Sequence, residues 1–152
     1  SSQKKNPLQP PFVGKASDAP GHIFIYKSGP KKIMATIEQG RETLKDGMSL
    51  VIFPEGSRTF TGHMAEFKKG AFMLADELQL PVVPLTISGS FNILPRTGKY
   101  LCWHPMKLVI HDPIYPQGQG PDNLKHLAEE SYKVIEASLP EKYKGKEVNP
   151  DQ

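Results

Sequence analysis

Segments with the apolar spacing of strands and of helices alternate along the chain. Four runs rich in β-branched and aromatic residues predict strands, because such residues suit a pleated, buried surface. They are residues 22–26, 49–53, 82–87 and 107–111, with a short additional strand near residues 100–103. The run at 49–53 is apolar enough to be buried on both faces, whereas Pro84 argues against a central position for the third strand.

Three segments have the apolar period of a helix. The first runs from Pro30 to Gly47, the second covers residues 70–79, and the third begins at Pro121 and is ended by Pro140. In the first of these segments one helical face carries Ile33, Ile37 and Leu44. In the last, one face carries Leu124, Leu127, Ala128, Ile135 and Leu139.

This alternation predicts an α/β fold: a mixed, largely parallel sheet flanked by helices, with right-handed crossovers in the first half. Residues 1–20 are rich in proline and are expected to be irregular. Residues 21–140 are expected to form a single domain, and residues 141–152 a charged, flexible tail.

Composition and charge narrow the function classes. The 152 residues carry a net charge of +3, too mild to indicate nucleic-acid binding but compatible with a phosphate-bearing substrate or an anionic membrane surface. A single cysteine excludes an intrachain disulfide and favours a reducing compartment. No signal peptide is visible, and no apolar run approaches the roughly 18 residues of a spanning helix. We expect a cytoplasmic location, with peripheral membrane contact as an option.

One loop has the residue types of an anion site. Phe53-Pro54-Glu55-Gly56-Ser57-Arg58-Thr59 directly follows the second predicted strand, and ligands bind α/β sheets at the carboxyl ends of strands. Gly56 lets a ligand oxygen approach the backbone, and Arg58 offers a planar fork of donors to a phosphate. Glu55 would repel a phosphate, so we expect it to orient Arg58 or to accept a bond from a substrate hydroxyl. The alternative is a solvated turn with a surface arginine.

These residues, with Phe67-Lys68-Lys69-Gly70-Ala71, closely resemble the third block of the glycerolipid acyltransferases, that is, the lysophosphatidate (1-acyl-glycerol-3-phosphate) acyltransferases and their glycerol-3-phosphate relatives. The resemblance implies that the glycerol-phosphate site contains Glu55, Gly56 and Arg58, with Ser57 between them. Lys68 and Lys69 either supplement phosphate binding or form a solvated basic pair before a helix.

Two further segments are similar to blocks of the same family. Residues 21–27 resemble the second block, which typically ends in arginine; Lys27 keeps the charge there but loses the bidentate fork. Residues 80–85 resemble the fourth block, which implies that an acyl or substrate pocket is shaped by Val82, Val83 and Pro84. The resemblance extends from about Pro11 to past His111, most of the chain.

The family's first block, His-x-x-x-x-Asp, does not occur in this sequence. There the histidine is the general base and the aspartate orients it. Five positions after its histidines the chain has Lys27, Lys68, Val109, Pro116 and Ser131. We therefore assign no catalytic residue and expect the dyad to be missing with the amino-terminal part of the family domain. Two local pairs, His63 with Glu66 and His22 with Asp18, are expected to be non-catalytic.

The other reactive side chains have simpler interpretations. Cys102 and His104 share a face of any strand they form, but a buried, inert thiol is favoured over a nucleophile. Trp103 and Phe91 are expected in the core or in a pocket wall, and no ligand spacing indicates a metal. The stripe of the last helix is expected to be core, with a weak interfacial option left by Lys125, Lys133, Lys142, Lys144 and Lys146.

The resemblance implies transfer of a fatty acyl group from acyl-CoA or acyl-carrier protein to a lysophosphatidate or glycerol-3-phosphate hydroxyl, in phospholipid biosynthesis. The thioester is a co-substrate, and no other cofactor is expected. Without the dyad this chain alone is expected to be inactive, and the alternative is a non-catalytic phosphate-binding or interaction module. A shortened sheet leaves an edge or apolar face uncovered, which predicts self-association or a cover formed by residues 1–20.

Overall fold

The computed structural model describes residues 37–38, 40–42, 44–45, 47–95, 98 and 100–145, and the chain divides into two compact units, residues 1–50 and 51–152. In the first unit, residues 37–38, 40–42 and 44 are helical, in agreement with the helix predicted to end at Gly47. Gly47 has φ +75° and donates its N–H to the Leu44 carbonyl at 3.2 Å, as a glycine that stops a helix does. The predicted strand at 22–26 lies outside the described residues.

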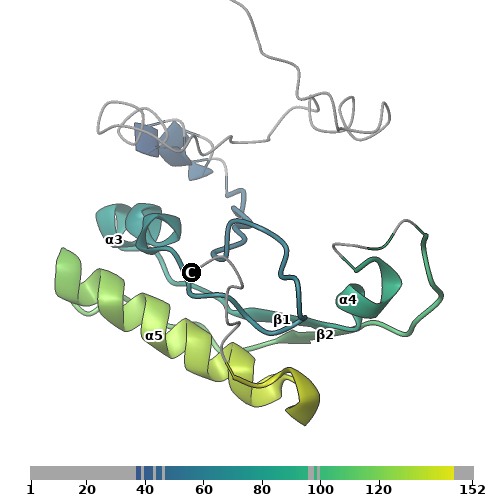
Figure 1. Cartoon of the computed structure of the whole chain (residues 1–152). Helices are drawn as coiled ribbons and strands as arrows, with labels where there is room; N and C mark the ends of the chain where they lie inside the picture. The colour runs from purple at the N-terminus through teal and green to yellow at the C-terminus, as the bar shows by residue number, and fades with distance from the viewer. Residues whose placement is uncertain are drawn as a thin grey trace, which may run out of the picture. The chain divides into compact units, whose positions relative to one another are not determined.

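Among its described residues, the second unit contains seven helices and strands. They are, in chain order, the 3-10 helix η1 (Lys69–Ala71), α3 (Met73–Leu78), β1 (Leu85–Ser88), α4 (Ser90–Ile93), β2 (Lys107–Ile110), α5 (Pro121–Ser138) and the 3-10 helix η2 (Glu141–Tyr143). Figure 1 shows α3 beside α5, and α4 just beyond the paired strands. The helices predicted at 70–79 and from Pro121 are confirmed as η1 with α3 and as α5.

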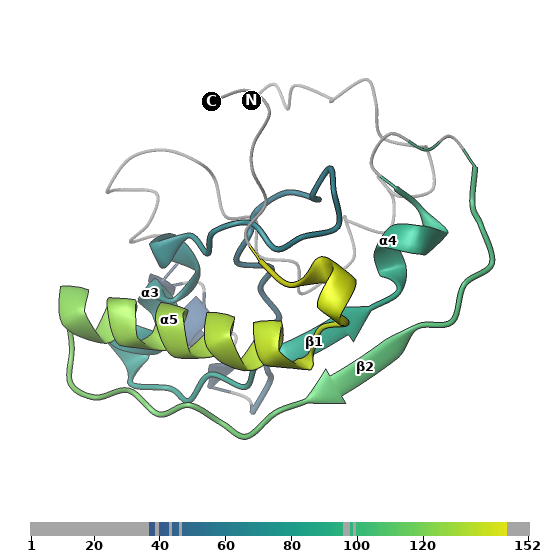
Figure 2. The same ribbon diagram turned by 60° about the horizontal axis from the view of Figure 1, so that its bottom comes forward.

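The sheet of the described residues is an antiparallel pair. Leu85 pairs with Ile110 and Ile87 with Leu108, and an isolated bridge between residues 82 and 114 continues the pairing. Figure 2 shows α5 reaching β1 while β2 forms the outer strand. Helices and strands are combined as expected, but the sheet among the described residues is not parallel. The two strands are joined through α4 on one side, so the chain returns beside itself in the opposite direction.

The two faces of this pair differ in burial. Thr86 is buried, whereas its neighbours Leu85 and Ile87 are exposed, in the alternation that a strand imposes. Their partners Leu108 and Ile110 are exposed as well, so four apolar side chains share one uncovered face. The self-association predicted from the sequence stays a prediction, and so does a cover formed by residues 1–20, which lie outside the described residues.

Two predicted strands are wrong. Residues 49–53 form no strand, and Phe53 is 72% exposed rather than buried. Residues 100–103 also form none, and their side chains face solvent. An apolar run becomes a strand only when a second strand completes its hydrogen-bond ladder, and none in the described part of the chain pairs with either run. The single-turn helix α4 was not predicted, because four residues are too few to show a helical period.

A buried polar network joins α3 to the start of α5. Asp76 is 7% exposed and accepts bonds from the Gly120 N–H at 3.0 and 3.1 Å and from Asn123 Nδ2 at 2.7 Å. Asn123 Oδ1 in turn accepts the Gln117 N–H at 2.7 Å. The carboxylate thus satisfies a donor that the first turn of α5 leaves unpaired and fixes the two helices to one another.

The core lies between the loop before η1 and the two longer helices. Its buried members are Met64, Phe67, Phe72 and Leu127. Partly buried apolar side chains surround them: Ala71, Ala75, Val82, Ile114, Leu124, Ala128, Tyr132, Ile135 and Leu139. The apolar stripe predicted for the last helix is therefore core, as expected from its spacing.

The chain remains ordered after α5. Residues 141–143 form η2, at the start of the segment expected to be a flexible tail. Tyr143 donates its hydroxyl to Asn92 Oδ1 at 2.8 Å and meets the Phe91 ring edge-on at 6.2 Å. One aromatic residue in a charged segment is thus enough to bring the chain back to α4. The predicted boundaries at residues 20 and 140 stay a prediction.

Candidate functional site

The loop at residues 54–69, called here the motif loop, begins with a tight turn. Gly56 donates its N–H to the Phe53 carbonyl at 3.1 Å, and Pro54 occupies the second position of the turn, where its fixed φ is favourable. Gly56 itself has φ +72°, a conformation that costs glycine least. The Lys68 N–H then donates to the Pro54 carbonyl at 2.9 Å, so the two ends of the loop are hydrogen-bonded to each other.

Glu55 holds the loop together from within. Its Oε2 accepts the Ala65 N–H at 2.9 Å, across ten residues of chain. The side chain is half-buried, and its negative charge contributes to a raised pKa of Tyr132; the larger causes are burial of the phenol and the Glu136 carboxylate. Glu55 therefore binds the backbone of its own loop, a positioning role that its residue type alone did not specify.

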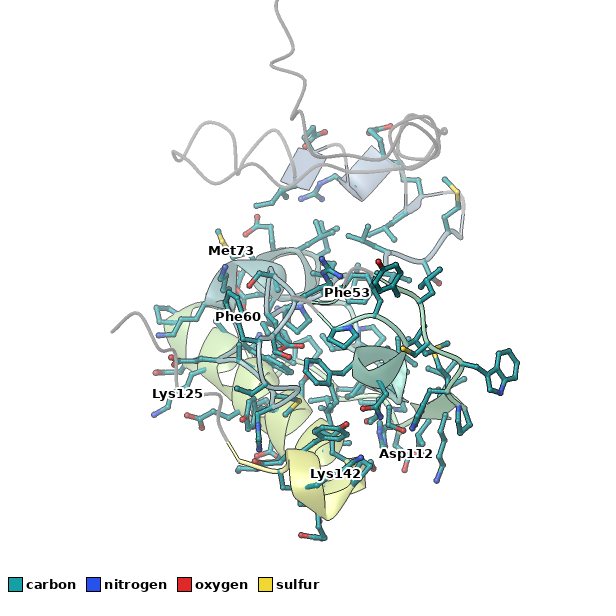
Figure 3. All side chains as sticks on the ribbon, turned by 45° about the vertical axis from the view of Figure 1, so that its right-hand side comes forward. Phe53, Phe60, Met73, Asp112, Lys125 and Lys142 are labelled. Carbon is teal, nitrogen blue, oxygen red and sulfur yellow. The ribbon has the colours of Figure 1, made fainter. Side chains whose placement is uncertain are left out.

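Two core residues fasten the motif loop to α5. Met64 and Phe67 are buried, and the Phe67 ring stacks on Phe72 at 6.3 Å and meets Tyr132 edge-on at 5.1 Å. Figure 3 shows Phe60 among the side chains of this loop and Lys125 on the adjacent α5. A segment expected to be an irregular loop thus supplies half of the buried apolar core.

A second contact fixes the middle of the loop to η2. Gly62 has φ +87°, and a Cβ built there would lie 2.9 Å from Tyr143 Cε1 and 3.1 Å from Phe91 Cδ1. Only glycine allows this approach without displacing an aromatic ring. The Gly62 N–H also donates to Thr59 Oγ1 at 3.1 Å, which closes a short local turn.

The cations of the motif loop lie on its solvent side. Arg58, Lys68 and Lys69 are exposed, as is Ser57. A Cβ built on Gly56 would lie 2.7 Å from Lys68 Nζ, so the ammonium stands directly over the glycine. The structure therefore joins two predicted site residues that are twelve positions apart, and it leaves Arg58 on the same exposed turn. An open backbone beside a cation, on a fixed loop, suits an anionic ligand.

The remaining predicted site residues lie elsewhere. Val82 belongs to the core, Pro84 is buried and accepts the His111 N–H at 3.1 Å, and Val83 between them is exposed. Burial thus alternates along these three residues, which directly precede β1. Their role in an acyl or substrate pocket stays a prediction. Lys27, like the pair of His22 and Asp18, lies outside the described residues.

Three of the described histidines lie within hydrogen-bond distance of neighbouring groups. His63 Nδ1 lies 3.1 Å from Thr61 Oγ1, and His111 Nε2 lies 2.7 Å from the buried Thr86 Oγ1. His104 is held between Asn92 and the Pro105 carbonyl. The absence of a catalytic role for these histidines stays a prediction. Cys102 is exposed rather than buried, and so is Trp103, against the expectation for both.

No group of three or more metal-ligating side chains comes together in the part of the chain that the structure describes. No helix within that part has the length and apolarity to cross a membrane.

Comparison with known proteins places the chain in a family. Residues 2–88, more than half of the sequence, match the family model described as acyltransferase. The chain belongs to the acyltransferase family. This confirms the resemblance that was drawn from the motif loop and from the segments before and after it.

The relatives and a solved structure are acyltransferases of one kind. The chain is 34% identical to a chloroplastic 1-acyl-sn-glycerol-3-phosphate acyltransferase of Brassica napus, over 69% of this chain and 31% of that protein. It is 30% identical to the enzyme of that name from Pseudomonas aeruginosa, over 91% of this chain and 54% of that protein. The crystal structure of the 1-acyl-sn-glycerophosphate acyltransferase PlsC from Thermotoga maritima superposes with a TM-score of 0.58 at 29% identity, covering 66% of this chain and 41% of that one. The chain thus spans about a third to a half of these proteins.

Proposed function

We propose that this chain provides the phosphate-binding part of a 1-acyl-sn-glycerol-3-phosphate acyltransferase of phospholipid biosynthesis. The observation that carries the proposal is the exposed turn at Gly56 with Lys68 Nζ above it, on a loop that Glu55 and the core hold in place. Membership of the acyltransferase family and the names of the relatives support it.

In the proposed reaction the acceptor hydroxyl attacks the carbonyl carbon of an acyl thioester of CoA or of a carrier protein. A C–O bond forms, the C–S bond breaks, and the thiol leaves with the proton of the hydroxyl. Arg58, with Lys68 and Lys69, holds the acceptor phosphate so that the hydroxyl is oriented, and Ser57 and Lys27 add donors. Val82, Val83 and Pro84 contribute to the wall along the acyl chain. The fold proposed for the acyltransferase domain is a mixed, largely parallel sheet flanked by helices.

Two further properties belong to this proposal. The acceptor is a lipid, so the protein makes peripheral contact with a membrane surface. The uncovered face of β1 and β2 supports self-association, because four exposed apolar side chains gather on it.

Binding of the acceptor tests the phosphate site directly. We expect titration with glycerol-3-phosphate to shift the backbone amide signals of residues 53–70. Arg58→Ala should weaken binding about tenfold, because a charge-assisted bond to phosphate is lost, and Arg58→Lys should fall between, since it keeps the charge but not the fork. Arg41→Ala, an exposed arginine on the helix of the first unit, is the matched control. Shifts confined to other residues would refute the site.

Turnover distinguishes the enzyme part from a binding module. The 152 residues contain no His-x-x-x-x-Asp, so we expect this chain alone to release no thiol from an acyl thioester in the presence of lysophosphatidate. This observation favours, as second candidate, a non-catalytic phosphate-binding module. Thiol release that depends on Arg58 would show that the chain contains a general base. It would not contradict the phosphate site.

A further inference from the structure

Residues 100–106, called here the aromatic loop, connect α4 to β2 and present apolar side chains to solvent. Trp103 is 99% exposed, Tyr100 81%, Leu101 76% and Met106 61%. Single exposed apolar residues are normal on a protein surface, but four within one short segment are not. The exposed Leu108 and Ile110 of β2 continue this apolar segment along the chain.

The backbone of the aromatic loop is held by specific bonds. The Cys102 N–H donates to the Ile93 carbonyl of α4 at 2.9 Å. The His104 ring joins the two segments as well, because Asn92 Nδ2 donates to its Nε2 at 3.1 Å and its Nδ1 lies 2.9 Å from the Pro105 carbonyl. A carbonyl only accepts and an amide nitrogen only donates, so both contacts require the same neutral tautomer, with the proton on Nδ1.

The fixed backbone means that the exposure is built into the fold. In a loop without fixed structure the tryptophan could turn inward. Here the hydrogen bonds to Ile93 and Asn92 fix the backbone path of the loop. Asn92 is itself held, since its Oδ1 accepts the Tyr143 hydroxyl. The aromatic side chains therefore remain outward unless a second apolar phase covers them.

The sequence on both sides of the loop carries charge of one sign. From residue 78 to residue 111 the sequence contains no aspartate or glutamate, while it contains Arg96, Lys99 and Lys107. Such a stretch is attracted to a negative surface, and each basic residue near an anionic bilayer adds about fivefold to binding. Tryptophan and tyrosine are the residues that prefer the boundary between lipid and water.

We propose that the aromatic loop is a membrane anchor that inserts into the interface of an anionic phospholipid bilayer, with Trp103 at its tip. Exposed aromatic side chains enter the headgroup region, and the neighbouring cations contact the lipid phosphates. This inference specifies the surface that makes the peripheral membrane contact of the proposed function. Its test is separate from that of acyl transfer, because binding to vesicles requires neither the phosphate site nor turnover.

Trp103 is the one tryptophan of the chain and so reports on its own environment. We expect its fluorescence maximum to move to shorter wavelength, and its quenching by acrylamide to fall, when vesicles of phosphatidylcholine with 30% phosphatidylglycerol, a composition chosen for the assay, are added. Pure phosphatidylcholine vesicles should produce a smaller change at the same lipid concentration. Unchanged emission at saturating anionic lipid overturns the proposal, even if the protein floats with the vesicles.

Variants separate insertion from folding. In vesicle flotation, Trp103→Ala and Leu101→Ser should each weaken binding about tenfold through lost apolar burial, and Lys107→Gln about fivefold on anionic vesicles only. Tyr115→Ala and Lys125→Gln are matched exposed controls outside the loop and should bind as the unaltered chain does. An equal loss of vesicle binding in the control variants would contradict the proposal. So would a shift of Trp103 fluorescence to shorter wavelength that grows with protein concentration in the absence of lipid, because something other than a bilayer would then cover the loop.

Discussion

The motif loop and the aromatic loop are anchored to the rest of the protein in opposite ways. The motif loop buries Met64 and Phe67 in the core and leaves Arg58 and Lys68 in water. The aromatic loop is held through backbone and polar contacts and leaves its apolar side chains outside. A loop that is anchored by apolar side chains presents its charged groups on the surface, whereas a loop that is anchored by polar groups presents its apolar side chains there.

The largest expected difference between the two loops is in stability. Phe67→Ala should lower the free energy of unfolding by about 3–5 kcal/mol, because it opens a cavity beside Phe72 and Tyr132. Leu101→Ala, in the aromatic loop, should change it by less than about 0.5 kcal/mol, because its side chain is exposed. Urea unfolding at equilibrium measures both.

A second control stays within one segment of the chain. Phe53→Ala removes the same atoms as Phe67→Ala, but from an exposed side chain just before the motif loop. We expect it to cost less than about 1 kcal/mol. Equal costs for the two phenylalanines would mean that the motif loop is not part of the core in solution.

A smaller effect is expected at the glycine of the turn. Gly56→Ala places a Cβ at φ +72° and 2.7 Å from Lys68 Nζ, so we expect a loss of about 1 kcal/mol in stability together with displacement of the ammonium. The measurements are thermal unfolding and titration with glycerol-3-phosphate. Weakened binding with near-normal stability would place the role of Gly56 in the ligand site.

Gly70→Ala is the matched control for that change. Gly70 lies in η1, has no atom within 4 Å of a built Cβ, and has no positive φ. Alanine there should be neutral or stabilising by up to about 1 kcal/mol, since it restricts the unfolded chain. A loss at Gly70 as large as that at Gly56 would contradict the special geometry of the turn.

The smallest expected effect on stability concerns the phenol of Tyr132, which contacts Phe67 of the motif loop. Burial, Glu136 and Glu55 raise the pKa of Tyr132, so the folded protein favours the neutral phenol. The resulting stability is present below the ordinary tyrosine pKa of about 10 and is lost as the pH rises above it. Tyr132→Phe should reduce this alkaline loss and be neutral or slightly stabilising at pH 7, because the buried hydroxyl has no hydrogen-bond partner.

The aromatic loop again supplies the control. Tyr100→Phe changes an exposed phenol and should leave the alkaline loss of stability in place. The measurement is urea unfolding of both variants at a series of pH values from 8 to 11, a range set by the ordinary tyrosine pKa. A flat profile in the unaltered protein would contradict the assignment to Tyr132.

The sequence predicted those features that depend on nearby residues. The stripe from Leu124 to Leu139 identified the buried face of α5 because a helix repeats every 3.6 residues, and the loop of Gly56 and Arg58 identified the acyltransferase family. Residue types at fixed spacing are sufficient for both inferences.

The features that were missed depend on contacts between distant parts of the chain. Nothing local shows that Asp76 will meet Gly120, or that Glu55 will accept the Ala65 N–H. The apolar residues near Trp103 suggested a strand or core because periodicity records hydrophobicity but not burial. Whether such a run is covered is decided by which segments pack on it.

Gly89, between β1 and α4, has a consequence for engineering. It has φ +93°, and a Cβ there would lie 2.2 Å from the Pro105 carbonyl oxygen, so a hydrogen atom is the largest substituent that this junction admits. The path of residues 100–106 is thus set by a position outside them. We expect the exposed positions of that segment to tolerate wide sequence exchange on an unchanged backbone, provided that Gly89 is kept, which makes the segment a place to graft other surface-binding peptides.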